Sequence, residues 1–239
     1  MQKFLDDAKD GAILFSFGSN AKSIYIAEKT LKAIIATFRK LKQRVIMKWE
    51  TDSLEGKPDN VFISKWLPQA DVLAHPNIKI FISHCGLGGV VESKFHGVPI
   101  IGIPQGGDQT SNAANIVNDG WAIQINFNDV TEETLSDAIN EILKNPKYSE
   151  TVKKLSILSR DRPLNAQQTA AYWVEYVIRH RGAKHLHYPG AEFNFFQENS
   201  LDVLAFLVTV VYLAFKLIKI ICKAIFCRKK TKDAKLKKN

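Results

Sequence analysis

The side chains best suited to chemistry lie between Trp66 and Gln109, where the sequence reads WLPQADVLAHPNIKIFISHCGLGGVVESKFHGVPIIGIPQGGDQ. This stretch presents, in order, a Trp, a Gln, a His beside a glycine cluster, a Glu and an Asp-Gln pair. Such groups could bind an aromatic base, a ribose, a diphosphate and a sugar in succession. Their order therefore favours a nucleotide-sugar site.

The centre of the stretch combines a His with a glycine turn. Ile78–Ser83 is a short apolar, β-branched run, typical of a buried parallel strand. His84 follows it, then a glycine-rich turn over 86–89 and a helix pattern over 90–96. A strand, a turn and a helix start form an anion site, because unpaired N–H groups and the helix dipole point at the ligand. The pattern leaves open a tight turn without a ligand and a structural His.

Two residues precede this turn at a strand-to-loop junction. An exposed Trp66 could stack on a nucleobase, a contact that contributes about 1–3 kcal/mol. Gln69 offers one acceptor and two donors to a base edge or a ribose. The alternative is a core Trp beside a loop Gln.

Acidic side chains follow the turn. Glu92 could accept hydrogen bonds from two ribose hydroxyls, or it could complement the dipole of the helix first turn. Asp108 and Gln109 suit vicinal sugar hydroxyls, or form an ordinary helix N-cap. Each simpler interpretation is credible alone, but the whole series in this order favours a ligand site.

The series resembles the signature of the UDP-glycosyltransferases, in the animal membrane-bound branch that includes the UDP-glucuronosyltransferases. The resemblance extends over nearly the whole chain. The matching residues are W-x-x-Q at Trp66 and Gln69, H-x-G at His84 and Gly86, Glu92, G-V-P at Gly97–Pro99 and P-x-x-x-D-Q at Pro104–Gln109, with FSFGSN at Phe15–Asn20 and RHRGAKHL at Arg179–Leu186.

The resemblance implies a role for each site residue. Trp66 would stack on uracil, while Gln69 and Glu92 hold the uridine. Ser19, His84 and the Gly86–Gly89 turn would hold the diphosphate, and Asp108 with Gln109 the donor sugar. Many relatives carry Asn and Ser where this chain has Gly88 and Gly89. Phosphate binding would therefore depend here on backbone N–H groups.

The implied reaction is an inverting transfer of glucose or glucuronic acid from a UDP-sugar to a hydroxyl of a small lipophilic acceptor. In the family an N-terminal domain supplies the acceptor pocket and a His base oriented by an Asp. This chain aligns with the C-terminal domain, so we expect no catalytic base in it and no transfer without the missing domain or a homologous subunit. We expect no cofactor and no metal, and interpret Asp6–Asp10 as a solvated turn.

Two other function classes remain in view. One is a non-catalytic, membrane-anchored protein that binds UDP-sugars or regulates full-length relatives. The other is a Rossmann-type oxidoreductase, which is disfavoured because no strand leads into G-x-G-x-x-G with an acid about 20 residues further on.

Alternating strand and helix patterns predict an α/β fold with a Rossmann-like parallel sheet. By resemblance this is the C-terminal domain of a GT-B glycosyltransferase. The expected strands cover 11–18, 44–49, 61–67, 78–83, 98–104 and 121–127, and the expected helices 23–41, 90–96, 110–118, 131–143, 148–159 and 166–181.

We predict four regions along the chain. Residues 1–187 form the UDP-sugar-binding domain, including a helix over 166–181 that by resemblance crosses back towards the acceptor domain. A linker over 188–200 leads to a transmembrane segment over 201–226 and a basic cytoplasmic tail over 227–239.

The charge distribution argues against nucleic acid as a partner. The formal net charge is +9, but ten Lys and Arg and a single Asp lie from Lys216 onward. The remaining 23 basic and 23 acidic residues cancel, so the globular part has no electrostatic footprint for DNA or RNA.

The C-terminal pattern predicts a membrane anchor. Residues 203–221 reach the length of about 20 residues that spans a bilayer, if Lys216 and Lys219 extend to an interface. A buried core helix or an amphipathic surface helix is the alternative, and the second is disfavoured because apolar residues surround the helix from Val203 to Phe215. The positive-inside rule places the tail in the cytoplasm and gives type I topology, with the domain in the lumen. Lys235–Asn239 resembles a dilysine signal of the endoplasmic reticulum, although no signal peptide opens the sequence.

Overall fold

The computed structural model describes residues 1–19 and 22–236, with side chains as far as Ile221 and that of Lys223. The chain divides into two compact units, Met1–Pro163 and Leu164–Asn239. Each is described separately.

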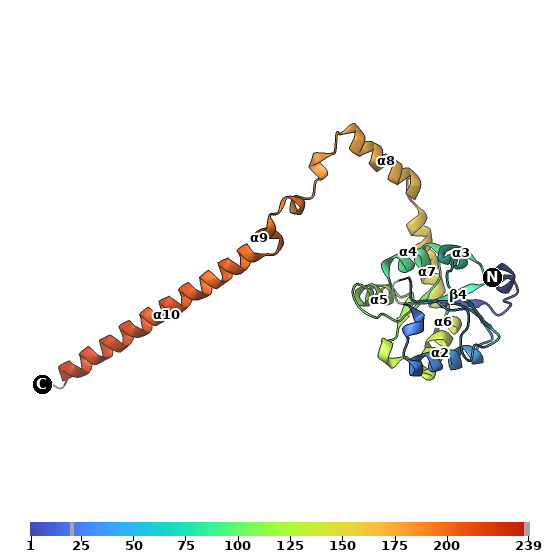
Figure 1. Cartoon of the computed structure of the whole chain (residues 1–239), viewed down its shortest axis with the longest axis horizontal. Helices are drawn as coiled ribbons and strands as arrows, with labels where there is room; N and C mark the ends of the chain where they lie inside the picture. The colour runs from blue at the N-terminus through green and yellow to red at the C-terminus, as the bar shows by residue number, and fades with distance from the viewer. Residues whose placement is uncertain (20–21, 237–239) are drawn as a thin grey trace. The chain divides into compact units, whose positions relative to one another are not determined.

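A six-stranded sheet forms the centre of the first unit (Figure 1). The strand order is β3-β2-β1-β4-β5-β6, and every neighbouring pair is parallel. The predicted fold class is thereby confirmed. The order reverses between β1 and β4, and ligands bind at such a switch point in open α/β sheets. The strands are β1 Ala12–Ser16, β2 Arg44–Lys48, β3 Val61–Ser64, β4 Ile78–Ser83, β5 Ile100–Gly102 and β6 Ala122–Gln124.

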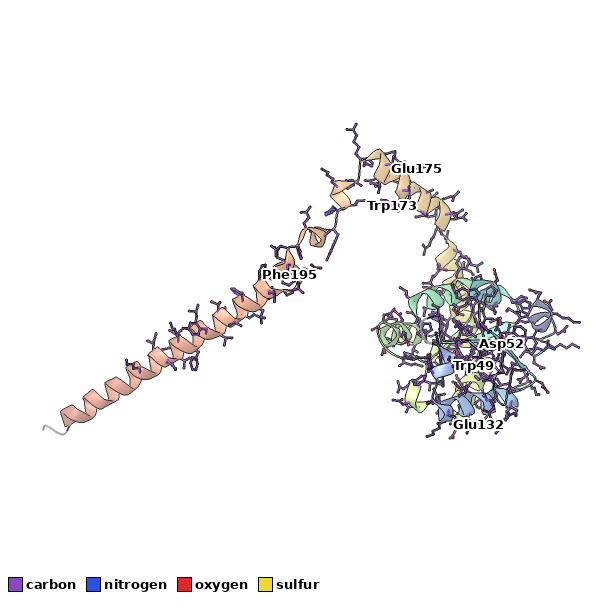
Figure 2. All side chains as sticks on the ribbon, viewed as in Figure 1. Trp49, Asp52, Glu132, Trp173, Glu175 and Phe195 are labelled. Atoms are coloured by element: carbon purple, nitrogen blue, oxygen red, sulfur yellow. The ribbon has the colours of Figure 1, made fainter. Side chains whose placement is uncertain are left out.

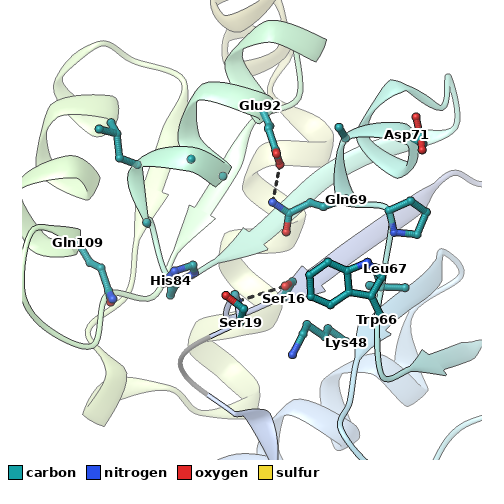
Figure 3. Close-up of a pocket in the computed structure, with 17 residues that line it drawn as sticks. Ser16, Ser19, Lys48, Trp66, Leu67, Gln69, Asp71, His84, Glu92 and Gln109 are labelled. Atoms are coloured by element: carbon teal, nitrogen blue, oxygen red, sulfur yellow. Dashed lines mark hydrogen bonds between the residues drawn. The ribbon is translucent and has the colours of Figure 1, made fainter.

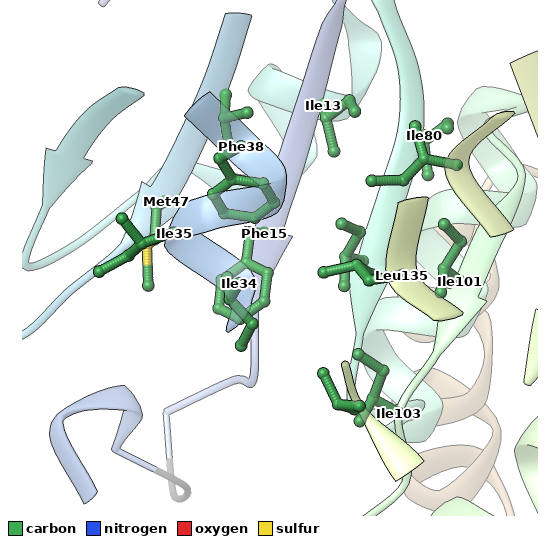
Figure 4. Packing of buried hydrophobic residues seen from close by; sticks show 14 of the residues in the cluster. Ile13, Phe15, Ile34, Ile35, Phe38, Met47, Ile80, Ile101, Ile103 and Leu135 are labelled. Carbon is green, nitrogen blue, oxygen red and sulfur yellow. The ribbon is translucent and has the colours of Figure 1, made fainter. Parts of the chain in front are cut away.

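Helices cover both faces of this sheet because successive strand residues point to opposite sides. In β1, Ile13 and Phe15 face a hydrophobic cluster completed by α2 and α6 (Figure 4). Leu14, between them, belongs to the cluster on the other face, with residues of α1, α3, α4, α5 and α7. The helices are α1 Gln2–Asp6, α2 Glu28–Lys40, α3 Gln69–Ala74, α4 Leu87–His96, α5 Gln109–Asn118, α6 Glu132–Lys144 and α7 Pro146–Arg160, with 3-10 turns η1 Ser23–Tyr25 and η2 Phe127–Asp129.

Several predicted boundaries were wrong. The helix expected over 23–41 divides into η1 and α2, because Ala27 between them has an extended backbone. Helix α4 begins at Leu87 rather than at residue 90, so Gly88 and Gly89 are helical and Gly86 is the N-cap residue. Helix α3 was not predicted, and it follows Pro68 directly. The segment interpreted as a solvated turn, Asp6–Asp10, begins at the last residue of α1, and the rest of it is a turn in which Asp7, Lys9 and Asp10 are exposed, as predicted.

The second unit is a series of helices without a sheet in its described part. They are α8 Ala166–Arg179, the 3-10 turns η3 Lys184–Leu186 and η4 Pro189–Glu192, α9 Phe195–Glu198 and α10 Leu201–Leu236. No residue of α8 is buried. The first unit ends at Pro163, so α8 falls in the second unit, and the predicted domain over 1–187 stays a prediction.

Helix α10 contains one stretch that is long and apolar enough to cross a membrane, among the residues described. That stretch is Leu201–Ile221, with 21 residues and a mean hydropathy of 2.3. The helix continues to Leu236, so much of the predicted tail over 227–239 is helical. Lys237 to Asn239, which complete the dilysine-like signal, lie outside the described residues.

Candidate nucleotide-sugar site

A pocket of about 610 Å³ lies at the carboxyl ends of β1 to β4, at the switch point of the sheet (Figure 3). It brings together every predicted donor-site residue except Asp108. Its walls are Ser16, Gly18, Ser19, Lys48, Trp66, Leu67, Pro68, Gln69, Ala70, Asp71, His84, Gly86, Leu87, Gly88, Gly89, Glu92 and Gln109.

His84 extends from the end of β4 and is held between two glycines. A Cβ added to Gly18 would lie 2.7 Å from Cε1 of His84, and one added to Gly86 would lie 2.5 Å from Nε2. Gly18 also has φ of +84°, which favours glycine. Because neither glycine has a Cβ, the imidazole can lie directly against the backbone at both positions.

Burial favours the neutral form of the His84 imidazole. Burial lowers its pKa below the ordinary value, and the negative charge of Asp108 and the backbone of Ser16 oppose this less strongly. Nδ1 is buried and lacks a hydrogen-bond partner within the described chain. A neutral imidazole still carries one N–H donor, so His84 can donate to an anion in the pocket.

The N-terminus of α4 opens onto the same pocket. Gly86 is its N-cap residue, and no side chain caps the helix. The first N–H groups of a helix have no intrahelical partners. A Cβ at Gly88 would meet nothing within 4 Å, so no neighbouring group covers the helix end at this position. The geometry suits an anion held by backbone groups.

Trp66 lies on the rim of the pocket and is 72% exposed. Its indole is exposed to solvent, whereas Trp49 and Trp121 are buried. The interpretation of Trp66 as a core residue is therefore wrong. A flat aromatic face in this position is available for stacking.

Gln69 and Glu92 form a pair across the pocket wall. Nε2 of Gln69 donates to Oε2 of Glu92 over 2.6 Å (Figure 3). Gln69 is the first residue of α3. Glu92 lies in α4 but beyond its first turn, and that first turn contains no acidic residue. Glu92 is therefore not a first-turn partner of the dipole. The pair places an amide and a carboxylate side by side, where they can exchange hydrogen bonds with hydroxyl groups.

Of the predicted Asp-Gln pair, one residue lines the pocket and the other lies outside it. Gln109 lines the pocket, and its Oε1 accepts from the backbone N–H of Gln105 over 2.8 Å. Asp108 is exposed and does not line the pocket. It is the N-cap residue of α5, but its side chain makes no capping bond and instead accepts from Nδ2 of Asn112 over 2.9 Å.

Sequence reasoning missed Lys48, whose side chain lines the pocket while only 10% exposed. Its Nζ lies 2.6 Å from Oε1 of Glu50, and Oε2 of Glu50 accepts from the backbone N–H of Ile24. A Lys at the end of a strand is usually a solvated residue. The signal available was the K-W-E triplet, which puts two opposite charges two residues apart.

The family model described as UDP-glucoronosyl and UDP-glucosyl transferase matches residues 1–237. The chain belongs to this family. It is 43% identical to UDP-glucosyltransferase 2 of Dactylopius coccus and 34% identical to human UDP-glucuronosyltransferase 2A2, each over 100% of this chain. It covers 47% and 44% of those proteins, and so spans about half the length of the curated relatives it matches.

Solved structures share the fold. The glycotransferase of kitacinnamycin is 27% identical with a TM-score of 0.61, over 70% of this chain and 43% of that one. Os79 from O. sativa, solved in complex with UDP, is 17% identical with a TM-score of 0.62, over 74% of this chain and 42% of that one. The oxidoreductase alternative is set aside by the family assignment.

One His–Asp pair in the first unit has the composition of a catalytic dyad, but it is structural. His75 Nε2 lies 3.1 Å from Oδ1 of Asp6, and Nδ1 accepts from the backbone N–H of Asn77. Both ring nitrogens are thus engaged, and His75 is outside the pocket lining. The pair attaches α1 to the loop before β4. The bond from His75 also lowers the pKa of Asp6.

Proposed function

We propose that this chain holds the UDP-sugar donor of a glycosyltransferase. The observation that carries the proposal is the single pocket at the sheet switch point, which gathers an exposed Trp, a Gln–Glu pair, a His and a bare helix N-terminus. Family membership supports a UDP-sugar as the ligand.

The nucleoside would occupy the side of the pocket formed by α3. Uracil stacks on Trp66, and the ribose hydroxyls donate to Glu92 while Gln69 holds the base or ribose edge. In this arrangement the Gln69–Glu92 hydrogen bond orients both side chains before the ligand arrives. Preorganised groups lose less conformational entropy on binding.

The diphosphate would lie against Ser19, His84 and the first turn of α4. Helix N–H groups and the imidazole N–H supply fixed donors without a full positive charge. These donors stabilise the charge that develops on UDP as it leaves, the type of effect that often dominates catalysis. Lys48 adds an ammonium to the same wall, moderated by Glu50. The sugar would extend towards Gln109, with Asp108 closing on it from the rim.

The reaction would be inverting transfer of glucose or glucuronic acid to a hydroxyl of a small lipophilic acceptor. Relatives named UDP-glucosyltransferase and UDP-glucuronosyltransferase support both sugars. The base and the acceptor pocket would come from residues outside this sequence, either an N-terminal domain or a homologous subunit. We further propose that α10 anchors the chain in the endoplasmic reticulum membrane as a type I protein, on the strength of its apolar span and animal relatives.

Isothermal titration calorimetry of the full chain in detergent micelles tests donor binding. We expect UDP to bind more tightly than uridine, and ADP to bind weakly. His84→Ala should weaken UDP while leaving uridine affinity unchanged, because the imidazole contacts only the diphosphate. Equal affinity for UDP and ADP, or an unchanged UDP affinity in His84→Ala, would contradict the site.

A turnover assay separates the half-enzyme from the alternative of a non-catalytic partner. The chain should bind UDP-glucose without transferring it, and should transfer only when co-expressed with an N-terminal half from a relative. Transfer by the chain alone would refute the half-enzyme proposal. UDP-sugar binding with no transfer in the combined sample would favour a regulatory partner.

A further inference from the structure

Three phenylalanines just before α10 are exposed to an unusual degree. Phe193, Phe195 and Phe196 have 52%, 68% and 62% of their surface exposed. We call these three residues the phenylalanine cluster. Figure 2 shows the side chain of Phe195 beside the start of the long helix. Large aromatic side chains at this exposure indicate a surface that something else covers.

The cluster belongs to an ordered turn. Oδ1 of Asn194 accepts from the backbone N–H groups of Phe196 and Gln197, and the side chain of Gln197 accepts from the backbone of Asn194. The rings of Phe195 and Phe196 lie 5.9 Å apart and nearly perpendicular. Helix α9 also packs against α10. The rings are therefore held outward by local structure.

Helix α9 ends three residues before the apolar span begins. The chain turns at Ser200, a non-glycine residue with φ of +55°, and α10 begins at the next residue. Asp202 lies in the first turn of α10. Its carboxylate belongs at the headgroup level, because a charge in hydrocarbon is costly. The cluster lies only a few residues from that level.

The length of the apolar span places the N-terminal end of α10 close to a membrane interface. The 21 residues of Leu201–Ile221 extend about 32 Å at the rise of an α-helix, close to the thickness of about 30 Å of the hydrocarbon core. Both ends of the stretch therefore lie near an interface.

We propose that the phenylalanine cluster inserts into the interfacial layer of the bilayer where α10 enters it, so that lipid covers the three rings. This inference rests on the proposed membrane anchor. Phenyl rings suit this layer. Asn194 lies between two of the rings, and the polar residues Gln197, Glu198 and Asn199 follow them and remain among headgroups and water. Three rings are far fewer than the about 20–30 residues a side of a stable protein interface, which favours lipid over a protein partner.

Photo-crosslinking tests this contact in the full chain. Phe195 and Phe196 are replaced one at a time by p-benzoylphenylalanine, the chain is reconstituted in phosphatidylcholine vesicles and irradiated, and adducts are identified by mass spectrometry. Phe206, within the span, serves as the lipid-facing reference, and Tyr25, exposed on the first unit, as the water-facing reference. We expect lipid adducts at both positions, with more than half the yield at Phe206 and many times the yield at Tyr25.

Each other outcome decides against the proposal. Crosslinks from Phe195 and Phe196 to protein would show that another surface covers the cluster. Yields as low as at Tyr25, with normal yield at Phe206, would place the cluster in water and leave the anchor intact. Absence of lipid adducts at Phe206 would refute the anchor itself, and the inference with it.

Discussion

The two units place similar aromatic side chains in opposite environments. In the first unit Phe15, Phe38 and Trp121 lie within hydrophobic clusters on the two faces of the sheet. In the second unit Trp173 and Phe195 remain about half exposed or more. Helices on both faces of the sheet bury the apolar side chains of the first unit. The helices of the second unit have no such second layer, so their apolar side chains need a membrane or a protein partner to cover them. Apolar composition therefore predicts burial only where the topology provides a second layer.

The largest expected effect contrasts the same change in the two units. Phe38→Ala should reduce the free energy of unfolding by about 3–5 kcal/mol, because it empties a fully packed position between β1 and α2. Phe195→Ala should change it little, because that ring is mostly exposed. Guanidinium denaturation of the full chain in micelles, followed by tryptophan fluorescence, measures both. Equal losses would show that the units unfold as one body.

A second contrast uses two exposed tryptophans. Trp66→Ala should weaken UDP binding by about 1–3 kcal/mol, or about 5- to 150-fold, because stacking is lost. Trp173→Ala removes an indole that contacts Tyr172 and Tyr176 edge-to-face in α8, and should leave UDP affinity unchanged. Calorimetry of both variants distinguishes a specific platform from general loss of aromatic surface. A comparable loss in Trp173→Ala would argue that the second unit contributes to the site.

A third contrast lies within one turn of the first unit. Gly86→Ala forces the added methyl against Nε2 of His84, whereas Gly88→Ala meets open space. Overpacking costs about 1–3 kcal/mol, and we expect the displaced imidazole to weaken UDP binding in Gly86→Ala. Gly88→Ala should bind UDP within about twofold of the parent, since its methyl lies at a free position of a helix. Equal losses would mean that the ligand, rather than His84, occupies that space.

The smallest expected effect is a pH dependence of donor affinity. Burial lowers the pKa of His84 from its ordinary value, and a bound diphosphate favours its protonated form. Affinity for UDP-glucose should therefore rise as the pH falls towards that pKa and level off below it, by no more than tenfold for each unit that the pKa shifts. UDP-glucose is chosen because its diphosphate does not titrate in this range. His84→Gln should abolish the dependence, and a persisting slope would assign it to another group.

The sequence predicted best those features that are set by local pattern. Ile78–Ser83 is the strand that its apolar run indicates, and the glycine turn after it lies at the pocket. The start of α4 was placed three residues late because glycines are poor helix formers, and tertiary packing overrides that preference. Helix α3, with six residues, is too short for periodicity to reveal. Gln69 is nevertheless the first residue of this helix, and its side chain donates to Glu92.

Long-range pairings could not be read from the sequence. Lys48 becomes a pocket residue because Glu50 neutralises it, and Glu50 is itself held by the backbone of Ile24, which lies 26 residues earlier. Asp6 and His75 are 69 residues apart, and no local pattern joins them. Asp108 was predicted together with Gln109, yet only the second lines the pocket, since Asn112 holds the first on the surface. Such outcomes depend on topology and on competition among hydrogen-bond partners.

The placement of the pocket has a consequence for the lifetime of the protein. Ser16, Lys48, Trp66 and His84 come from the ends of four different strands, so the pocket exists only when the sheet is complete. A donor that binds there favours the folded chain by about 2.7 kcal/mol at a hundredfold excess over its Kd. Proteases act on unfolded chains, so abundant nucleotide sugar would slow degradation of the first unit. All the lining residues precede Pro163, and cleavage sites after it would stay as sensitive as before.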